Sequence, residues 1–138
     1  MRRLALVMVA VLTATVLSGC GKHGTKLPVS EMTAHSDADG VQRVEVDAHS
    51  FYFKPNRIVV ERGKPVDLTV HFKSWFAPHN FTCFDQDAGI SASISAGAFS
   101  FGKTRHVKFT PTKAGEFEFF CHVDSHAKKG MKGTLVVR

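Results

Sequence analysis

Three side chains that can bind a soft metal ion lie close together near the C-terminal end of the chain. Cys121, His126 and Met131 supply a thiol, an imidazole and a thioether, each five positions after the last. A thiolate, an imidazole nitrogen and a weak thioether belong to the ligand set of a blue-type copper site, whereas zinc more typically recruits further cysteines or histidines. Such a copper site usually takes a second histidine, which must come from elsewhere in the chain.

The stretch SWFAPHNFTCF, residues 74–84, supplies that second histidine. His79 follows Pro78 and precedes an apolar segment that predicts a strand. Cys121 in turn ends the alternating segment EFEFFC, and Gly133 begins the last apolar segment. We therefore expect the loop between the final two strands to bring Cys121, His126 and Met131 to the same end of the domain as His79.

Two alternatives to metal binding compete for these residues. Met131 is the only methionine after residue 40, and a methionine can simply fill a gap in the core. In an oxidising compartment Cys83 and Cys121 could form a disulfide, which would make the chain a non-metal adhesion or accessory module. The metal interpretation requires both thiols to stay free, with Cys83 as a buried core residue.

The elements that must position these residues are short strands. From residue 41 onward apolar and polar residues alternate, as in VDLTVHF (66–72), and glycines and prolines separate the alternating segments. This pattern predicts an all-β sandwich or barrel of one domain, residues 41–138, without a sustained helical segment. Residues 85–98, DQDAGISASISAGA, are small and polar, and we expect a loop there with a short helical turn.

The first twenty residues have the features of a secretory leader. Arg2 and Arg3 precede an apolar stretch that is too short to span a bilayer comfortably, and LSGC ends it. LSGC resembles the bacterial lipobox, which implies cleavage after residue 19 and a lipid on Cys20. Residues 20–40 are then a polar tether, and the protein is expected as a membrane-anchored lipoprotein of the cell envelope or periplasm. Gly21 after Cys20 fits outer-membrane sorting by analogy.

Charge limits the partners that the chain can have. The total of +6 falls to +4 once Arg2 and Arg3 leave with the leader, and no run of lysines and arginines is interleaved with aromatics. Nucleic-acid binding therefore has no support. Acidic proteins and anionic head groups remain plausible partners, and we expect a monomer.

These motifs together resemble the cupredoxins, the type 1 copper proteins. The resemblance is carried by PHN before an apolar strand, by F-x-F-x-C, by the C-x4-H-x4-M loop and by G-x-L-x-V, with FYFKPNRIVVERGKPVDLTV similar to the opening strands. It covers residues 44–138 and implies a Greek-key β-sandwich. It also implies one type 1 copper ion held by His79, Cys121, His126 and Met131. In addition, Asn80 would tie the His79 loop to the Cys121 loop through hydrogen bonds.

The chain departs from the enzymes that share this resemblance. His122 follows Cys121 as in multicopper oxidases, but Phe120 breaks their His-Cys-His triplet and the sequence has no His-x-His pair. Ser125 replaces the second cysteine that a binuclear purple copper site needs. We therefore expect no enzymatic activity. The Lys128–Gly130 run and Phe117, where a tyrosine is common, leave a blue or a green site open.

Two functions use the expected copper site. The first is one-electron transfer, with a redox protein docking near Trp75 and Phe76 around an exposed edge of His79, or at His126. Lysines 128, 129 and 132 would steer an acidic partner to this region. The alternative is a copper-buffering or copper-tolerance protein of the periplasm that uses the same ligands.

Overall fold

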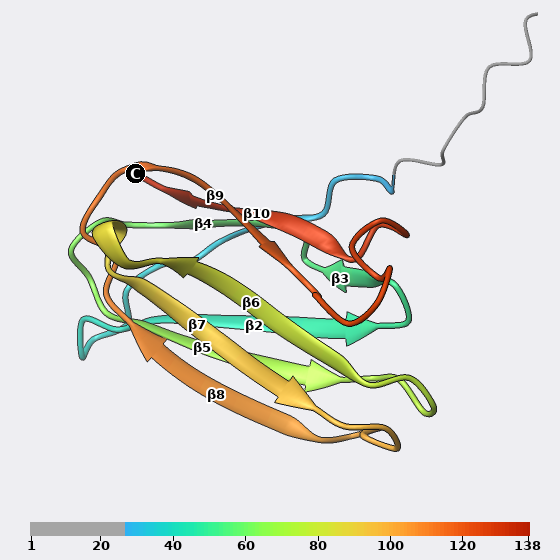
Figure 1. The fold of residues 1–138 in the computed structure, drawn as a ribbon. Coiled ribbons are helices and arrows are strands. Elements are labelled where there is room, and N and C mark those ends of the chain that lie inside the picture. The colour runs from blue at the N-terminus through green and yellow to red at the C-terminus, as the bar shows by residue number, and fades with distance from the viewer. Residues whose placement is uncertain (1–26) are drawn as a thin grey trace, which may run out of the picture.

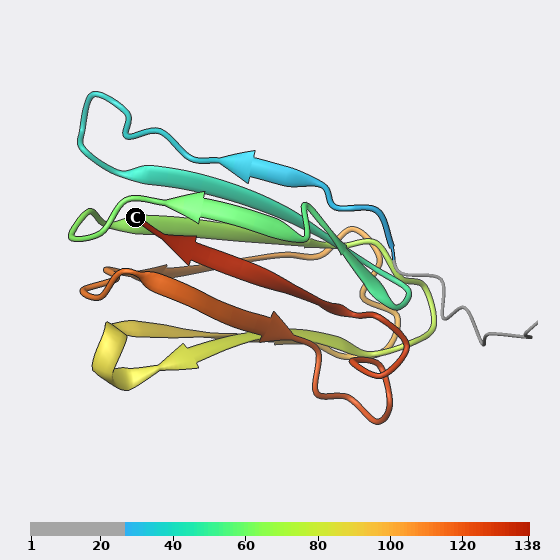
Figure 2. The same cartoon turned by 90° about the horizontal axis from the view of Figure 1, so that it is seen from above.

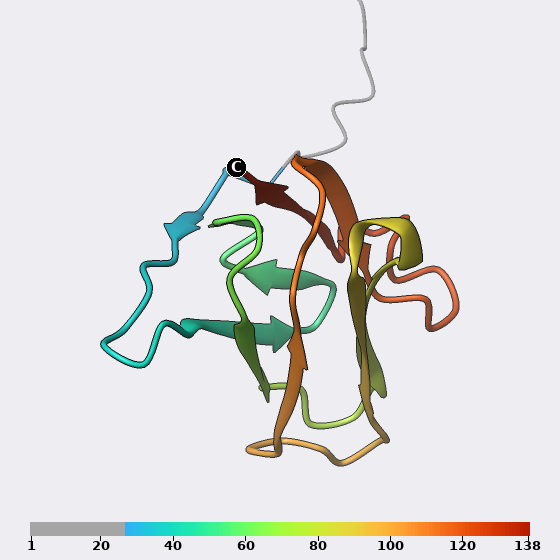
Figure 3. The same cartoon turned by 90° about the vertical axis from the view of Figure 1, so that its left-hand side faces the viewer.

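The computed structural model describes residues 27–138, so the expected leader (1–19) and Cys20 lie outside the described residues. The described chain forms two sheets that face each other across one apolar core (Figures 1 and 3). One sheet has the strand order β1-β4-β10-β9-β6-β7 and the other has the order β3-β2-β5-β8. The strands are β1 (Glu31–Thr33), β2 (Gln42–His49), β3 (Tyr52–Lys54), β4 (Arg57–Val60), β5 (Val66–Phe72), β6 (His79–Asp85), β7 (Ile90–Ala96), β8 (Thr104–Phe109), β9 (Gly115–Phe120) and β10 (Lys132–Val137).

Alternation of apolar and polar residues decides which face of each strand is buried. In β5, Val66, Leu68, Val70 and Phe72 are buried while the residues between them are partly exposed. Successive side chains of a strand point to opposite faces, so this alternation places one complete row in the core. The predicted all-β sandwich is confirmed. Among the described residues no helix is long and apolar enough to cross a membrane.

Three phenylalanines from different strands meet in the core. The ring centroids of Phe53 and Phe81 are 5.5 Å apart, those of Phe53 and Phe119 are also 5.5 Å apart, and Phe81 stacks on Phe119 at 4.8 Å. Aromatic pairs at such distances add stabilisation beyond the burial of their area. Phe81 and Phe119 lie two residues from His79 and Cys121, so this cluster supports the strand ends that carry the candidate ligands.

The expected loop at residues 85–98 is wrong over most of its length. The short helical turn is present as the 3-10 helix η1 (Gln86–Ala88), but β7 follows and pairs antiparallel with β6. Ile90, Ala92 and Ala96 are buried, whereas the serines between them are exposed. The segment is an alternating strand, but its alternation is weak in the sequence because alanine and serine differ little in size.

The expected tether, residues 20–40, is also wrong where the structure describes its later part. Strand β1 pairs in parallel with β4, and the amide of Ala34 donates a 2.8 Å hydrogen bond to the carbonyl of Val59. Ala34 itself is buried in the core. Residues 31–34 therefore belong to the folded domain, which begins before residue 41.

Candidate metal centre

Two neighbouring strands and one loop position the candidate ligands. His79 is the first residue of β6, Cys121 directly follows β9, and Met131 directly precedes β10. His126 lies in the loop between β9 and β10. Strands β6 and β9 are bridged where Thr82 faces Phe120, which brings the start of one to the end of the other. All four residues are buried.

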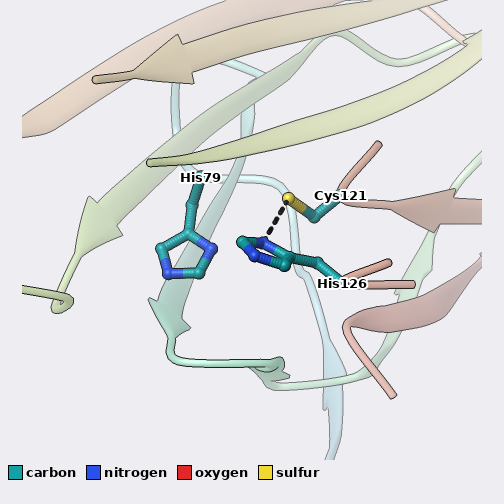
Figure 4. Close-up of side chains that lie close together, drawn as sticks. All are labelled: His79, Cys121 and His126. Carbon is teal, nitrogen blue, oxygen red and sulfur yellow. Dashed lines mark hydrogen bonds between the residues drawn. The ribbon is translucent and has the colours of Figure 1, made fainter. Parts of the chain in front are cut away.

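The donor atoms of His79, Cys121 and His126 converge on one point (Figure 4). These atoms lie within 4.8 Å of one another, and the Cys121 Sγ is 3.6 Å from the His126 Nδ1. The two imidazole ring centroids are 4.9 Å apart. A thiol and two imidazoles that meet in this way can bind a soft metal ion.

Backbone hydrogen bonds close the loop that carries His126. The amide of Cys121 donates to the carbonyl of Met131 at 3.0 Å, and the amide of Met131 donates to the carbonyl of His126 at 3.0 Å. The amide of His126 in turn donates to the carbonyl of Val123 at 3.0 Å. The backbone of Met131 is therefore hydrogen-bonded to both Cys121 and His126. This places the α-carbon of the buried Met131 next to these two candidate ligands.

Asn80 joins the two segments that meet at the site. Its Oδ1 accepts a 2.9 Å hydrogen bond from the backbone N–H of His122, and its own backbone N–H donates to the Cys121 Sγ at 3.4 Å. Hydrogen bonds of this kind orient metal ligands and limit how far they can move. Asn80 thus fixes the position of the thiol relative to His79.

The His79 ring is buried without hydrogen bonds to the described part of the chain. Its side chain is 1% exposed, and neither ring nitrogen has a hydrogen-bond partner among residues 27–138. Burial, with a smaller contribution from the charge of His126, lowers the pKa of His79 to about 4. A buried polar atom without a partner costs free energy, which a bound metal ion would recover. A neutral imidazole is also the form that binds metals. The site therefore fits a metal ion.

Phe51 closes the site from the turn between β2 and β3, a role for which no sequence motif provides a signal. Its ring centroid lies 4.9 Å from that of His126 and 6.4 Å from that of His79, in edge-on contacts. The Lys129 Nζ lies 4.3 Å from the centroid of the same ring. Phe51 has a φ of 72°, a region that bulky residues rarely adopt and that is often retained at functional sites.

Comparison with known proteins identifies the family. The family model described as a cupredoxin-like domain matches residues 7–137. The chain is a cupredoxin. A search of curated proteins gave no match.

Solved structures share the fold of this cupredoxin at low sequence identity. Reduced auracyanin from Roseiflexus castenholzii is 17% identical, with 70% of this chain and 96% of that chain covered and a TM-score of 0.58. Auracyanin A from Chloroflexus aurantiacus, a "blue" copper protein, is 21% identical, with 72% and 100% covered and a TM-score of 0.57. The metal-binding domain of the Streptococcus pneumoniae D39 Cu(I)-exporting P-type ATPase CopA, solved with Cu(I), is 23% identical, with 80% and 98% covered and a TM-score of 0.56.

Other sequence-based expectations for this cupredoxin have different outcomes. The expected exposed edge of His79 is wrong, because this residue is only 1% exposed, less than His126 at 6%. The neighbouring Trp75 and Phe76 are exposed to solvent instead.

Cys83 and Cys121 are both free, so the disulfide alternative fails. Burial, and to a lesser degree the charge of Asp85, raises the pKa of the Cys83 thiol to about 12. His122 is exposed, and its Nδ1 lies 3.2 Å from the Thr82 Oγ1.

Proposed function

We propose that this cupredoxin binds one type 1 copper ion through His79, Cys121, His126 and Met131 and transfers single electrons. The observation that supports this most directly is the His79 ring, whose two nitrogens are buried beside a thiol and a second imidazole and have no hydrogen-bond partner among the described residues. Copper(II) and copper(I) both accept thiolate and imidazole ligands, and Met131 would supply a further, weak thioether ligand.

Electron transfer fits the site better than catalysis does. All the proposed ligands come from the protein and are buried, and two hydrogen bonds between Asn80 on β6 and the Cys121–His122 segment hold them before any metal arrives. A site whose ligands cannot rearrange keeps a similar geometry in both oxidation states, so little reorganisation accompanies the gain or loss of an electron. No further position is offered to a substrate.

We place the docking of a redox partner on the His126 side of the site. His126 is the less buried of the two histidines, and the half-buried ring of Phe51 covers it. Lys128 and Lys129 are exposed on the same loop and would attract an acidic partner. An interface of this kind is small, as in other weak redox encounters.

The location of the protein in the cell envelope is also a proposal. It rests on the leader-like residues 1–19 and on Cys20, whose lipidation the LSGC motif implies. A lipid there would hold the domain at a membrane surface, where membrane-bound electron carriers are available. The domain is proposed to act as a monomer.

Copper buffering in the same compartment is the second candidate. The fold is shared with the metal-binding domain of a Cu(I)-exporting ATPase, which was solved with Cu(I) bound. A buffering protein would use the same four ligands but would not need fast electron exchange.

The first test is a copper titration of the purified, reduced protein, followed by visible absorption and electron paramagnetic resonance. We expect an intense thiolate-to-copper band that saturates at one equivalent of Cu(II). Cys121→Ser should abolish the band, whereas Cys83→Ala, which removes the other buried thiol, should keep it. A colourless wild-type protein, or colour that survives Cys121→Ser, would refute the type 1 site.

A second measurement separates the two candidates. A carrier should give a reversible couple in voltammetry and a fast self-exchange rate by NMR line broadening. A buffer is expected to exchange electrons slowly and to hold Cu(I) in competition with chelators, and its deletion should make cells sensitive to copper.

A further inference from the structure

Four large aromatic side chains are exposed at the end of the sandwich that carries the metal centre. Trp75 and Phe76 lie on the loop between β5 and β6, and Phe99 and Phe101 lie on the loop between β7 and β8. Their exposed fractions are 59%, 79%, 72% and 48%. Figure 2 shows both loops at the same end as the β9–β10 loop. We call these four residues the aromatic tip. A cluster of this size on one surface marks an interaction site.

The aromatic tip is held in place by contacts between the two loops. Trp75 stacks on Phe101 with centroids 4.5 Å apart, and Phe76 meets Phe99 edge-on at 6.3 Å. Each pair takes one ring from each loop. The amide of Gly102 also donates a 2.8 Å hydrogen bond to the carbonyl of Phe72, which joins the loop bases. The rings are thus displayed to solvent by an organised structure.

The surroundings of the aromatic tip are basic. Residues 72–84 and 96–109 contain no aspartate or glutamate, and the exposed residues next to the tip include Lys73, Lys103 and Arg105. Asp47 lies 3.7 Å from the Lys73 Nζ and partly offsets its charge, which leaves Lys103 and Arg105 without such a partner among the described ion pairs. Apolar rings above a basic collar match a surface with anionic head groups over an apolar layer.

The path of the chain brings this end of the domain near a membrane if Cys20 is lipidated. The Leu27 Cδ1 lies 3.7 Å from the position that a Cβ would occupy on Gly130, so the described chain starts beside the β9–β10 loop (Figure 1). Cys20 precedes Leu27 by seven residues, which span at most about 25 Å when extended. A lipid on Cys20 would therefore keep the metal-bearing end within reach of the bilayer.

We propose that the aromatic tip inserts into the head-group region of an anionic lipid bilayer and turns the metal-bearing end of the domain toward the membrane. Trp and Phe are suited to this region because their rings bury a large apolar area, and the indole N–H of Trp can stay hydrogen-bonded at the head-group level. A lipid on Cys20 would hold the domain at the bilayer without fixing its orientation, and the tip and its basic collar supply the contact that fixes it. The proposal rests on the envelope location given under the proposed function, and it is independent of copper.

Trp75 is the only tryptophan of the chain, so its fluorescence reports on the aromatic tip alone. The experiment uses the copper-free mature chain, residues 20–138 with Cys20→Ser, which cannot be lipidated, and vesicles of phosphatidylethanolamine with phosphatidylglycerol. We expect the Trp75 emission to shift to the blue on binding and to be quenched by brominated acyl chains. Phe76→Ser and Phe99→Ser should each weaken partitioning by about tenfold, the loss expected for one buried phenyl ring.

Matched controls separate the possible occupants of the tip. Phe84→Ser removes an equally exposed phenylalanine from β6 and should leave partitioning unchanged. Lys103→Gln should weaken binding to anionic vesicles but not to pure phosphatidylcholine. The proposal fails if vesicles leave the Trp75 emission unchanged, or if Phe84→Ser is as harmful as Phe76→Ser. A blue shift that needs no vesicles and grows with protein concentration would assign the tip to a second copy of the chain. The copper titration with Cys121→Ser reads out the metal site separately, so a failure here leaves the proposed copper site standing.

Discussion

Protonation of His79 should contribute to the loss of stability of the copper-free protein in acid. The pKa of the His79 side chain is about 4 in the folded protein, whereas in the unfolded chain it takes the ordinary histidine value of 6.5. Between these two pH values the unfolded chain binds a proton at His79 that the folded chain does not, so stability falls as the pH falls. The difference of about 2.5 pH units corresponds to roughly 3 kcal/mol, none of it lost above pH 6.5 and all of it lost below pH 4.

Urea unfolding of the reduced, copper-free chain between pH 7 and pH 4 measures this loss. Other groups titrate in the same range, so the quantity to compare is the difference between the wild-type chain and His79→Leu. We expect the wild-type protein to lose about 3 kcal/mol more than the variant. His79→Gln, which is polar but does not titrate, should behave like His79→Leu and so separates titration from packing. Parallel stability curves for all three chains would refute the assignment of a depressed pKa to His79.

Three further perturbations test the surroundings of the site. Asn80→Ala leaves the amide of His122 without its 2.9 Å acceptor and should lower the free energy of unfolding by about 1–2 kcal/mol in urea titrations; an unchanged midpoint would contradict the linking role of Asn80. Phe51→Gly should be more stable than Phe51→Ala by about 1 kcal/mol in thermal unfolding, because only glycine adopts a φ of 72° freely; the usual order, with alanine more stable, would speak against strain at this turn. Gly133→Ala would force its Cβ into the Phe119 ring and should cost about 3 kcal/mol or more, seen as a lower Tm, and a wild-type Tm would rule out this close packing.

The sequence was most informative about the metal site, because cysteine, histidine and methionine are uncommon residues with distinctive ligand chemistry. A thiol, an imidazole and a thioether at even spacing suggested a metal, and the strand-ending EFEFFC and the strand-beginning HNF placed two ligands at strand ends. The structure brings Cys121 and His126 together with His79, which the sequence indicated among eight histidines because it begins an apolar segment directly after Pro78. Strands such as β5, which carry large apolar residues on one face, could be predicted equally well from the alternation of apolar and polar residues.

Other features depended on contacts between distant segments and could not be found in the sequence. Strand β1 has only three residues, and it exists because β4 offers it a parallel partner. Phe51 covers the site because the β2–β3 turn contacts the β9–β10 loop. No sequence pattern around Phe51 predicts this contact. The burial of His79 likewise depends on the rings of Phe51 and His126 beside it. These contacts cannot be seen in the sequence, which is why the expected exposed edge is wrong.

The rigidity of the metal centre derives from the rows of side chains that build the core. On β6, His79 is followed at alternate positions by the buried Phe81 and Cys83, and on β9 the buried Phe119 precedes Cys121 by two positions. Residues two apart in a strand share a face, so both ligands are end members of core-facing rows. Because Phe81 and Phe119 stack at 4.8 Å, moving one ligand relative to the other would disturb the packing of the core. The sandwich therefore holds the thiol and the imidazole in one arrangement without metal, which is what a one-electron carrier requires.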